Sequence, residues 1–187
     1  MKRITIILFT LSLISFSFNY SHAQESKPDY VKDIHDGALF FRMKTNLKKM
    51  QALRDANNQK EAEDLKTETA ASIERWKDAF RTHYNFGKVY FFNDYDGYSI
   101  QSGVFDGKIF DLNGKVVNGF DGPVVVIGID QTENLDIDGL ILLDQDMNQL
   151  PKNTPNFISA YGAMRMKKRT EAEMVINLNE SLHNRFK

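Results

Sequence analysis

The first half of the chain carries apolar residues at helical spacing. One stripe recurs every three or four positions and predicts the buried face of a long helix that ends near 85–87: Ala62, Leu65, Thr69, Ile73, Trp76 and Phe80. A shorter stripe of Leu47, Met50 and Leu53 predicts a helix that Thr45 and Asn46 cap. Asn57 and Asn58 separate the stripes. The pattern leaves open whether they form a turn between two helices or a polar patch in a single helix.

Short apolar runs predict strands on both sides of these helices. Residues 38–43 precede the helices, and residues 88–92 follow them after Gly87. Residues 124–129 and 140–143 are almost wholly apolar, which is typical of strands that are covered on both faces. We expect these last two runs near the centre of a sheet.

The remaining strand candidates are shorter or less regular. Residues 109–111 and 115–117 flank Asn113 and Gly114, a pair that favours a hairpin with a type I′ turn. Three further segments are weaker candidates: 98–105, 157–158 and 163–167.

The C-terminal segment predicts an amphipathic helix. Thr170 and Glu173 have the spacing of a capping box. An apolar stripe follows, formed by Ala172, Val175, Ile176, Leu178, Leu182 and Phe186. Together the elements predict an α/β (α+β) fold, with a mixed β-sheet, a long right-handed helical crossover after the first strand, hairpin-connected later strands and a C-terminal helix. We expect a flexible lead-in at 24–36 and a single domain at 37–187.

The N-terminus has the pattern of a signal peptide. Lys2 and Arg3 precede an apolar run at 4–18, and Ala23 ends a short polar stretch. A membrane anchor is the competing interpretation, but the apolar run is shorter than the roughly 20 residues that cross a bilayer. We therefore expect cleavage after Ala23 and an exported chain, periplasmic or extracellular, with no stable membrane anchor.

Composition narrows the possible functions. The chain has no cysteine, which excludes disulfides, thiol chemistry and zinc sites with cysteine ligands. Residues 1–23 hold two of the 24 Lys and Arg residues and none of the 25 Asp and Glu residues, so the rest of the chain is slightly acidic. This balance argues against nucleic acid as a partner.

One segment resembles a calcium-binding loop. Asn134, Asp136, Asp138 and Gly139 have the spacing that opens an EF-hand-type loop. Gln145 stands where the closing carboxylate belongs, and the residues after Gly139 favour a strand. We interpret the segment as an acidic loop that leads into a strand and assign no metal site.

Two groups of residues offer general acid or base chemistry. His35 and Asp36 precede the first strand, where a carboxylate could orient an imidazole for general base catalysis. A surface histidine in a loop is the commoner explanation, and we favour it. Asp94 and Asp96 lie in a turn after the strand at 88–92. The remaining histidines of the exported chain, His83 and His183, fall in the last turns of predicted helices, where the helix dipole accounts for them.

Two basic clusters are candidate anion sites because each lies beside the start of a predicted helix. The first contains Arg42, Lys44, Lys48 and Lys49. The second contains Arg165, Lys167, Lys168 and Arg169. Solvated surface charge is the interpretation that we favour for both.

Residues 37–49, the long charged helix, residues 86–92 and the stretch LILLDQDMNQLPKNTPNF resemble an uncharacterised family of exported bacterial proteins. That resemblance implies no activity, cofactor or site residue. We assign no catalytic or cofactor-binding residue, and we expect an exported soluble domain that binds an unknown protein or small ligand or serves the cell envelope. A cofactor-independent hydrolase-type enzyme that uses His35 with Asp36, or the acids of the turn at 94–96, is the alternative.

The signal-peptide prediction has a direct test. Because Ala23 is the small residue best placed after the apolar run, the exported protein should begin at Gln24. Intact-mass measurement of protein recovered from outside the cytoplasm checks this. A mass that retains residues 1–23 would contradict it.

Overall fold

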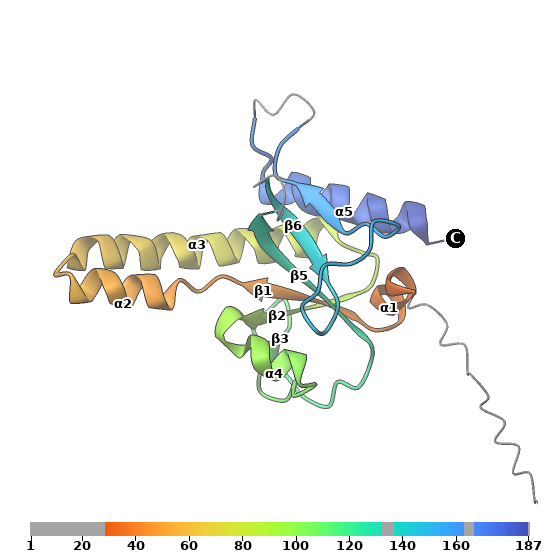
Figure 1. Ribbon diagram of the computed structural model, residues 1–187, viewed down its shortest axis with the longest axis horizontal. Coiled ribbons are helices and arrows are strands. Elements are labelled where there is room, and N and C mark those ends of the chain that lie inside the picture. The colour runs from red at the N-terminus through yellow and green to blue at the C-terminus, as the bar shows by residue number, and fades with distance from the viewer. Residues whose placement is uncertain (1–28, 132–136, 163–166, 187) are drawn as a thin grey trace, which may run out of the picture.

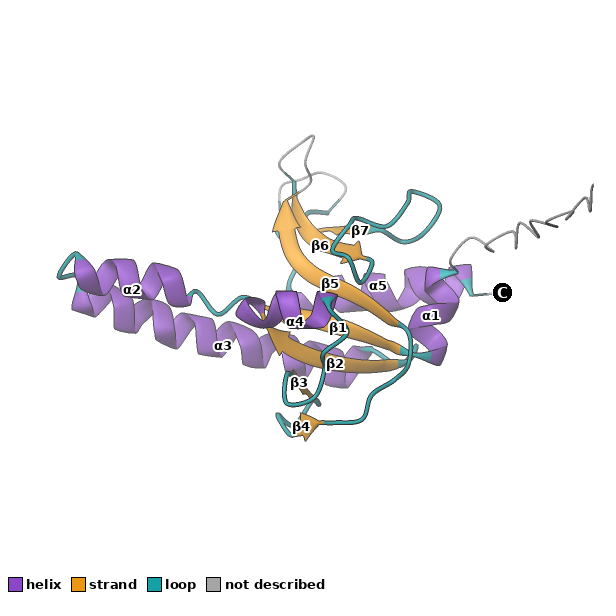
Figure 2. Cartoon of the chain, turned by 60° about the horizontal axis from the view of Figure 1, so that its bottom comes forward, coloured by secondary structure: helices purple, strands orange, loops and turns teal. Residues whose placement is uncertain are grey.

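The computed structural model describes residues 29–131, 137–162 and 167–186. In this part of the chain a seven-stranded mixed sheet, in the order β4-β3-β2-β1-β5-β6-β7, has helices on both faces (Figures 1 and 2). The strands are β1 (Ala38–Met43), β2 (Lys88–Asn93), β3 (Ile109–Phe110), β4 (Val116–Val117), β5 (Val124–Gln131), β6 (Asp138–Leu143) and β7 (Phe157–Ser159). The helices are α1 (Tyr30–Asp36), α2 (Leu47–Asp55), α3 (Gln59–His83), the 3-10 turn η1 (Asp94–Asp96), α4 (Gly97–Gln101) and α5 (Glu171–Arg185). The predicted α+β fold is confirmed.

Strand β1 is the centre of the topology. It pairs in parallel with β2 on one side and with β5 on the other, and the outer strands are antiparallel. Helices α2 and α3 form the predicted crossover from β1 to β2. The later strands pair with their neighbours in the sequence and are antiparallel, as predicted: β3 pairs with β4, β5 with β6, and β6 with β7.

One face of the sheet packs against α3 and α5. Phe41 of β1 contacts Trp76 and Phe80 of α3, with ring centroids 5.0 and 5.2 Å apart. Val175, Leu178 and Leu182 of α5 are fully buried in the same cluster. Trp76 and Phe80 of the first predicted stripe and Val175, Leu178 and Leu182 of the second therefore lie in this core, whereas Ile176 of the second stripe is 37% exposed. Phe186, at the end of the second stripe, is 42% exposed instead.

The opposite face has a thinner cover, made of α4 and the loops around β3 and β4 (Figure 2). Phe105 and Phe120 pack on Phe40 of β1, with ring centroids 5.2 and 5.3 Å apart. The buried cluster includes Ala38 and Phe40 of β1 and Val124 and Val126 of β5. The next residues on this face, Arg42 and Gly128, lie outside the cluster, so the cover ends before the carboxyl ends of these strands.

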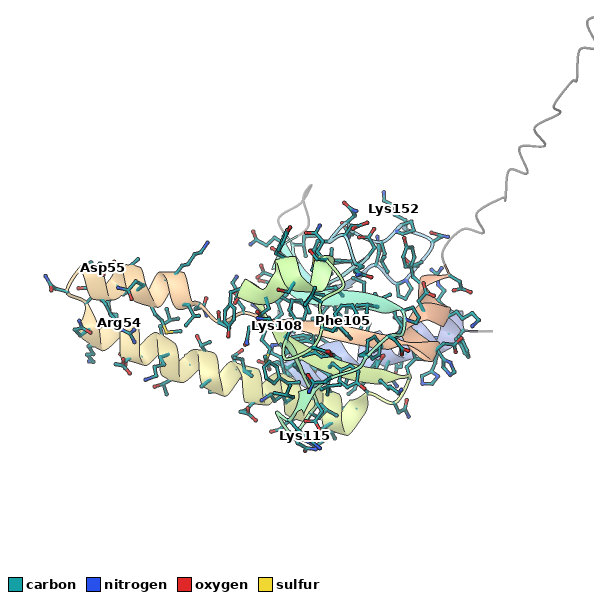
Figure 3. The ribbon with its side chains drawn as sticks, turned by 90° about the horizontal axis from the view of Figure 1, so that it is seen from below. Arg54, Asp55, Phe105, Lys108, Lys115 and Lys152 are labelled. Atoms are coloured by element: carbon teal, nitrogen blue, oxygen red, sulfur yellow. The ribbon has the colours of Figure 1, made fainter. Side chains whose placement is uncertain are left out.

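Helix α2 and the first part of α3 extend beyond the sheet as a two-helix arm (Figure 1). Asn57 has a φ of 61° and ends the first helix, so the segment contains two helices and not one. Arg54 bonds Glu63 across the turn at 3.1 Å. Arg54 and Asp55 lie near the free end of the arm in Figure 3.

The predicted flexible lead-in is wrong for residues 30–36, which form α1. The Asp29 side chain accepts a hydrogen bond from the Lys32 N–H at 3.2 Å and caps the helix. Val31 and Ile34 are buried on one side of this seven-residue helix. Two apolar positions are too few for the spacing to stand out from a polar segment. Residues 1–28, with the predicted signal peptide, lie outside the described residues.

Two local predictions in the second half also need correction. Residues 97–101 form α4 instead of a strand, because Ile100 alone is buried there while Tyr98 points outward. The β3–β4 connection is a longer loop and not a two-residue turn. The Asp111 carboxylate accepts the N–H groups of Asn113 and Lys115, both at 2.8 Å, and of the turn pair only Gly114 has a positive φ. The strand candidate at 163–167 lies almost wholly outside the described residues.

The capping box of α5 is confirmed. The Thr170 hydroxyl accepts the Glu173 N–H at 3.2 Å, and the Glu173 carboxylate accepts the Thr170 N–H at 2.7 Å. This backbone hydrogen bond holds the pKa of Glu173 below its usual value. Within the described ranges, none of the helices has the length and apolar character needed to span a bilayer.

The core packing predicts the effect of removing Trp76, which is 4% exposed. Trp76→Ala deletes the ring between α3 and β1 and should lower the free energy of unfolding by about 3–5 kcal/mol. Denaturant titration measures this value. Tyr98→Ala is the matched control because Tyr98 is 82% exposed, and its effect should stay within about 0.5 kcal/mol. Equal losses in the two variants would contradict this account of the core.

Candidate functional site

The carboxyl ends of the parallel strands β1, β2 and β5 meet at one edge of the sheet. Ligands of open α/β sheets bind at such edges, where successive connections leave toward opposite faces. Here the connection after β1 leads to α3 on one face, and the connection after β2 leads to α4 on the other. Two cavities lie at this edge, one of about 310 Å³ around Arg42 and one of about 320 Å³ around Lys48. We call them the Arg42 cavity and the Lys48 cavity.

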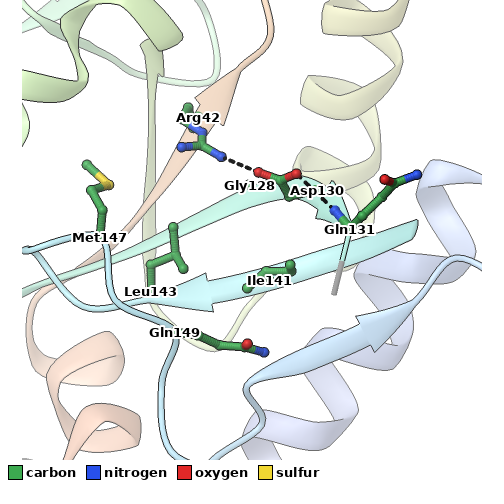
Figure 4. Close-up of a pocket in the computed structure, with 8 residues that line it drawn as sticks. All are labelled: Arg42, Gly128, Asp130, Gln131, Ile141, Leu143, Met147 and Gln149. Carbon is green, nitrogen blue, oxygen red and sulfur yellow. Dashed lines mark hydrogen bonds and ion pairs between the residues drawn. The ribbon is translucent and has the colours of Figure 1, made fainter. Parts of the chain in front are cut away.

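The register of the sheet places Arg42 on the floor of its cavity. Arg42 of β1 lies opposite Gly128 of β5, which lies opposite Ile141 of β6, so the three residues form one row across the sheet. A Cβ atom on Gly128 would lie 3.2 Å from the Arg42 Nε and Nη2 atoms. The glycine thus gives the guanidinium room to lie against the strand (Figure 4).

Among the described residues, the Arg42 guanidinium has one hydrogen-bonding partner, Asp130. Arg42 Nη2 donates to Asp130 Oδ2 at 3.2 Å, and Asp130 Oδ1 accepts the Gln131 N–H at 2.9 Å. The Arg42 side chain is 28% exposed, whereas that of Asp130 is 62% exposed. Among the described residues no other group bonds the Arg42 side chain, so its remaining N–H donors are available to water or a ligand.

Apolar side chains and the polar side chain of Gln149 line the part of the cavity opposite this ion pair. Ile141 and Leu143 of β6 lie below Arg42 in Figure 4, and Met147 lies beside them. Met147 has a φ of 66°, in a turn that Asp144 closes by accepting the Asn148 N–H at 2.9 Å. The arrangement can hold a small molecule that has an oxyanion at one end and an apolar group at the other.

The Lys48 cavity contains the other members of the first basic cluster. Lys44, Lys48 and Lys49 line it, together with Asp94 and Tyr95. Within the described chain these three lysines make no ion pair. Asn46 does not cap α2 with its side chain, and the first turn of α2 carries no acid. The predicted cluster is therefore divided, because strand alternation points Arg42 into one cavity and the chain after Met43 carries the lysines to the next.

The predicted acid–base groups lie far apart. His35 Nδ1 is 2.8 Å from Asp36 Oδ1, and this hydrogen bond, with the Lys32 ammonium, holds the pKa of Asp36 below its usual value. His35 is also stacked on Phe186 with ring centroids 4.2 Å apart, at the amino end of β1. Asp94 lies at the opposite edge, where it accepts the Thr45 hydroxyl. The pair at His35 therefore does not share a site with the Asp94 turn.

Asp96, the other acid of that turn, and His183 have structural partners. Asp96 is buried and pairs with Lys108 at 2.9 Å. His183 Nε2 lies 2.9 Å from Asn85 Oδ1, and both His183 and His83 are in the last turns of their helices, as predicted. These contacts account for the residues as parts of the fold.

The second basic cluster is engaged in protein contacts where it is described. Arg169 donates to the Ser159 carbonyl at 2.7 Å, and Lys168 pairs with Asp138 at 3.5 Å. Lys167 is exposed, and Arg165 lies outside the described residues. Of the described members, Arg169 and Lys168 thus have protein partners, and the candidate anion site at this cluster stays untested.

The calcium-like segment is only partly described. Asn134 and Asp136 lie outside the described residues, whereas Asp138 and Gly139 begin β6, the strand that was expected there. Gln145 donates to the Ile100 carbonyl at 3.4 Å. Within the described ranges no three His, Asp or Glu side chains come together in a way that could hold a metal ion.

No protein-family model, curated protein or solved structure matches the chain. The chemistry of the carboxyl edge therefore has to be inferred from its own residues. Of the two cavities, the Arg42 cavity is the stronger candidate for a specific ligand site. Its charged group, Arg42, is held over Gly128 by the pairing of β1, β5 and β6. The Lys48 cavity is lined by lysines near the start of α2. Solvated charge at a helix end accounts for these lysines as well as an anion site does.

The geometry predicts that the Arg42–Asp130 pair contributes little to stability. Since Asp130 is mostly exposed, Arg42→Met and Asp130→Asn should each change the free energy of unfolding by no more than about 1 kcal/mol. Lys108→Met is the comparison, because it leaves the buried Asp96 carboxylate without its cation and should cost more. Denaturant titration of the three variants checks the order. A larger loss in Arg42→Met than in Lys108→Met would show that Arg42 is a structural residue.

Proposed function

We propose that the chain is an exported binding protein that holds a small carboxylate-bearing ligand in the Arg42 cavity. The observation that carries the proposal is the Arg42 guanidinium, which lies on a central strand beside an open cavity and bonds only Asp130 in the part of the chain that the structure describes. Charged groups on central strands are costly to desolvate, and ligand binding is a common reason to retain them. A cavity of about 310 Å³ is at the small end of the range for ligand sites.

The charges of the cavity favour a carboxylate over a phosphate. The planar guanidinium matches the two oxygens of a carboxylate and can donate to both. Asp130 lies directly beside Arg42, so the cavity contains one positive and one negative group. A dianion would be repelled by Asp130 more strongly than a monoanion. Ile141 and Leu143 favour an aliphatic group next to the carboxylate.

The proposed location follows from the predicted signal peptide and shares its test. An exported domain meets its ligand in the periplasm or the medium. A role as an accessory of the cell envelope is compatible with ligand binding, because the cavity occupies one edge of the sheet and leaves the arm and the helical face free for other contacts.

The rival hydrolase function has one observation in its favour, the contact of 2.8 Å between His35 and Asp36. A binding protein returns its ligand unchanged, whereas a hydrolase converts esters or amides of that ligand. Incubation with such derivatives, followed by mass spectrometry, separates the two functions. Turnover that His35→Ala abolishes would favour the hydrolase.

The binding proposal is tested with 4-methylpentanoate, a branched monocarboxylate, and with its neutral amide. Titration calorimetry should show that the wild-type protein binds the acid at least about tenfold more tightly than the amide. Arg42→Gln should abolish this difference, and Arg42→Lys should restore only part of it because an ammonium lacks the planar fork. Lys115→Gln is the matched control, since it removes a positive charge from the β3–β4 loop (Figure 3).

Two results would contradict the proposal. One is the absence of binding of 4-methylpentanoate and of related monocarboxylates by a folded wild-type protein. The other is an equal loss of affinity in Arg42→Gln and Lys115→Gln, which would indicate a general effect of charge and not a site at Arg42.

A further inference from the structure

We infer that the ligand of the Arg42 cavity is a free α-amino acid with a branched aliphatic side chain, whose ammonium group is bound by Asp130. The inference rests on the proposed function and adds the second charged group of the ligand. It follows from the pairing of opposite charges in the cavity and from the apolar residues that face them.

The first argument is the distance between the two charges. Arg42 Nη2 and Asp130 Oδ2 are 3.2 Å apart, so groups that bind them must be immediate neighbours in the ligand. A carboxylate and an ammonium on the same carbon satisfy this condition. In a peptide the two charged termini are separated by at least one further residue, so a peptide cannot place both on this pair.

The second argument is that Asp130 is held in place and remains accessible. Its Oδ1 atom accepts the Gln131 N–H at 2.9 Å, while its Oδ2 atom faces Arg42. The side chain is 62% exposed, so an ammonium group can reach it from solvent. A ligand with both charges would replace one internal ion pair by two, whereas a simple carboxylate has to compete with Asp130 for the guanidinium.

The third argument concerns the rest of the ligand. Ile141, Leu143 and Met147 line the cavity on the side away from the ion pair (Figure 4). Gly128 carries no side chain in the row between Arg42 and Ile141, and the Arg42 guanidinium lies in the space that a side chain would take. The polar head and the aliphatic side chain of the ligand would therefore lie over neighbouring strands of the same row.

The test compares leucine with 4-methylpentanoate, which has the same skeleton without the ammonium group. Calorimetry on the folded chain from residue 24 to residue 187 should show that the wild-type protein binds leucine about tenfold more tightly or better. Asp130→Asn should weaken leucine and leave 4-methylpentanoate unchanged or tighter, because Arg42 loses its competing partner. A purely structural defect would weaken both ligands. Asp121→Asn, an exposed charge outside the cavity, is the matched control.

Glycylleucine provides a second comparison, because it carries the same side chain and carboxylate but a more distant ammonium. It should bind no more tightly than 4-methylpentanoate. Equal binding of leucine and 4-methylpentanoate by the wild-type protein would overturn this inference and leave the proposed carboxylate site intact. Tightest binding of glycylleucine would overturn it in favour of a peptide C-terminus. Failure of all three ligands would instead contradict the proposed function.

Discussion

The burial of β1 on both faces is the constraint on which the rest of the structure depends. Its parallel neighbours occupy both edges, Phe41 packs into the helical layer, and Phe40 packs under the loop layer. A parallel strand in this position requires a crossover on each side, and these crossovers supply α3 on one face and α4 with its loops on the other. The C-terminal helix α5 completes the α3 layer. The layers differ in extent, because α3 and α5 together cover one face while α4 and the loops cover only part of the other. The Arg42 cavity lies where the shorter layer ends.

The row that contains the cavity departs twice from what stability alone would favour. An apolar side chain at Arg42 would extend the core, and replacing half-buried charge by packed apolar groups is often stabilising. Gly128 in the middle of β5 gives up side-chain packing and strand propensity. Both departures occur opposite each other in the register, and the glycine is what accommodates the arginine. Coupled local costs of this kind are typical of functional positions in an otherwise consistent fold.

Sequence patterns predicted the elements that bury a regular stripe and missed those that do not. The α3 and α5 stripes and the runs of β1, β5 and β6 were found because burial imposes a period on them. Helix α1 and helix α4 were missed because each buries only one or two side chains.

The candidate site was predicted only in part from the sequence. Arg42 was named, but as a neighbour of Lys44, and its partner Asp130 is 88 residues away, a pairing that no local pattern reports. A charged residue inside the run ALFFRM, and a glycine inside VVVIGI, were the available signals.

The two cavities flank the end of β1 but differ in charge. The Lys48 cavity is lined by several cations, whereas the Arg42 cavity pairs one cation with one anion, so the two cavities act differently on an anionic ligand. Lys44, Lys48 and Lys49 give the edge a positive field that attracts anions in general, over a distance that salt limits to about 8 Å at physiological ionic strength. Arg42 lies two residues before Lys44, about 7 Å along an extended chain, and so within that field. Attraction by the lysines does not distinguish one monoanion from another. Discrimination has to arise where a cation, an anion and an apolar surface meet at fixed distances, and in the described chain the Arg42 cavity combines the three at the carboxyl edge.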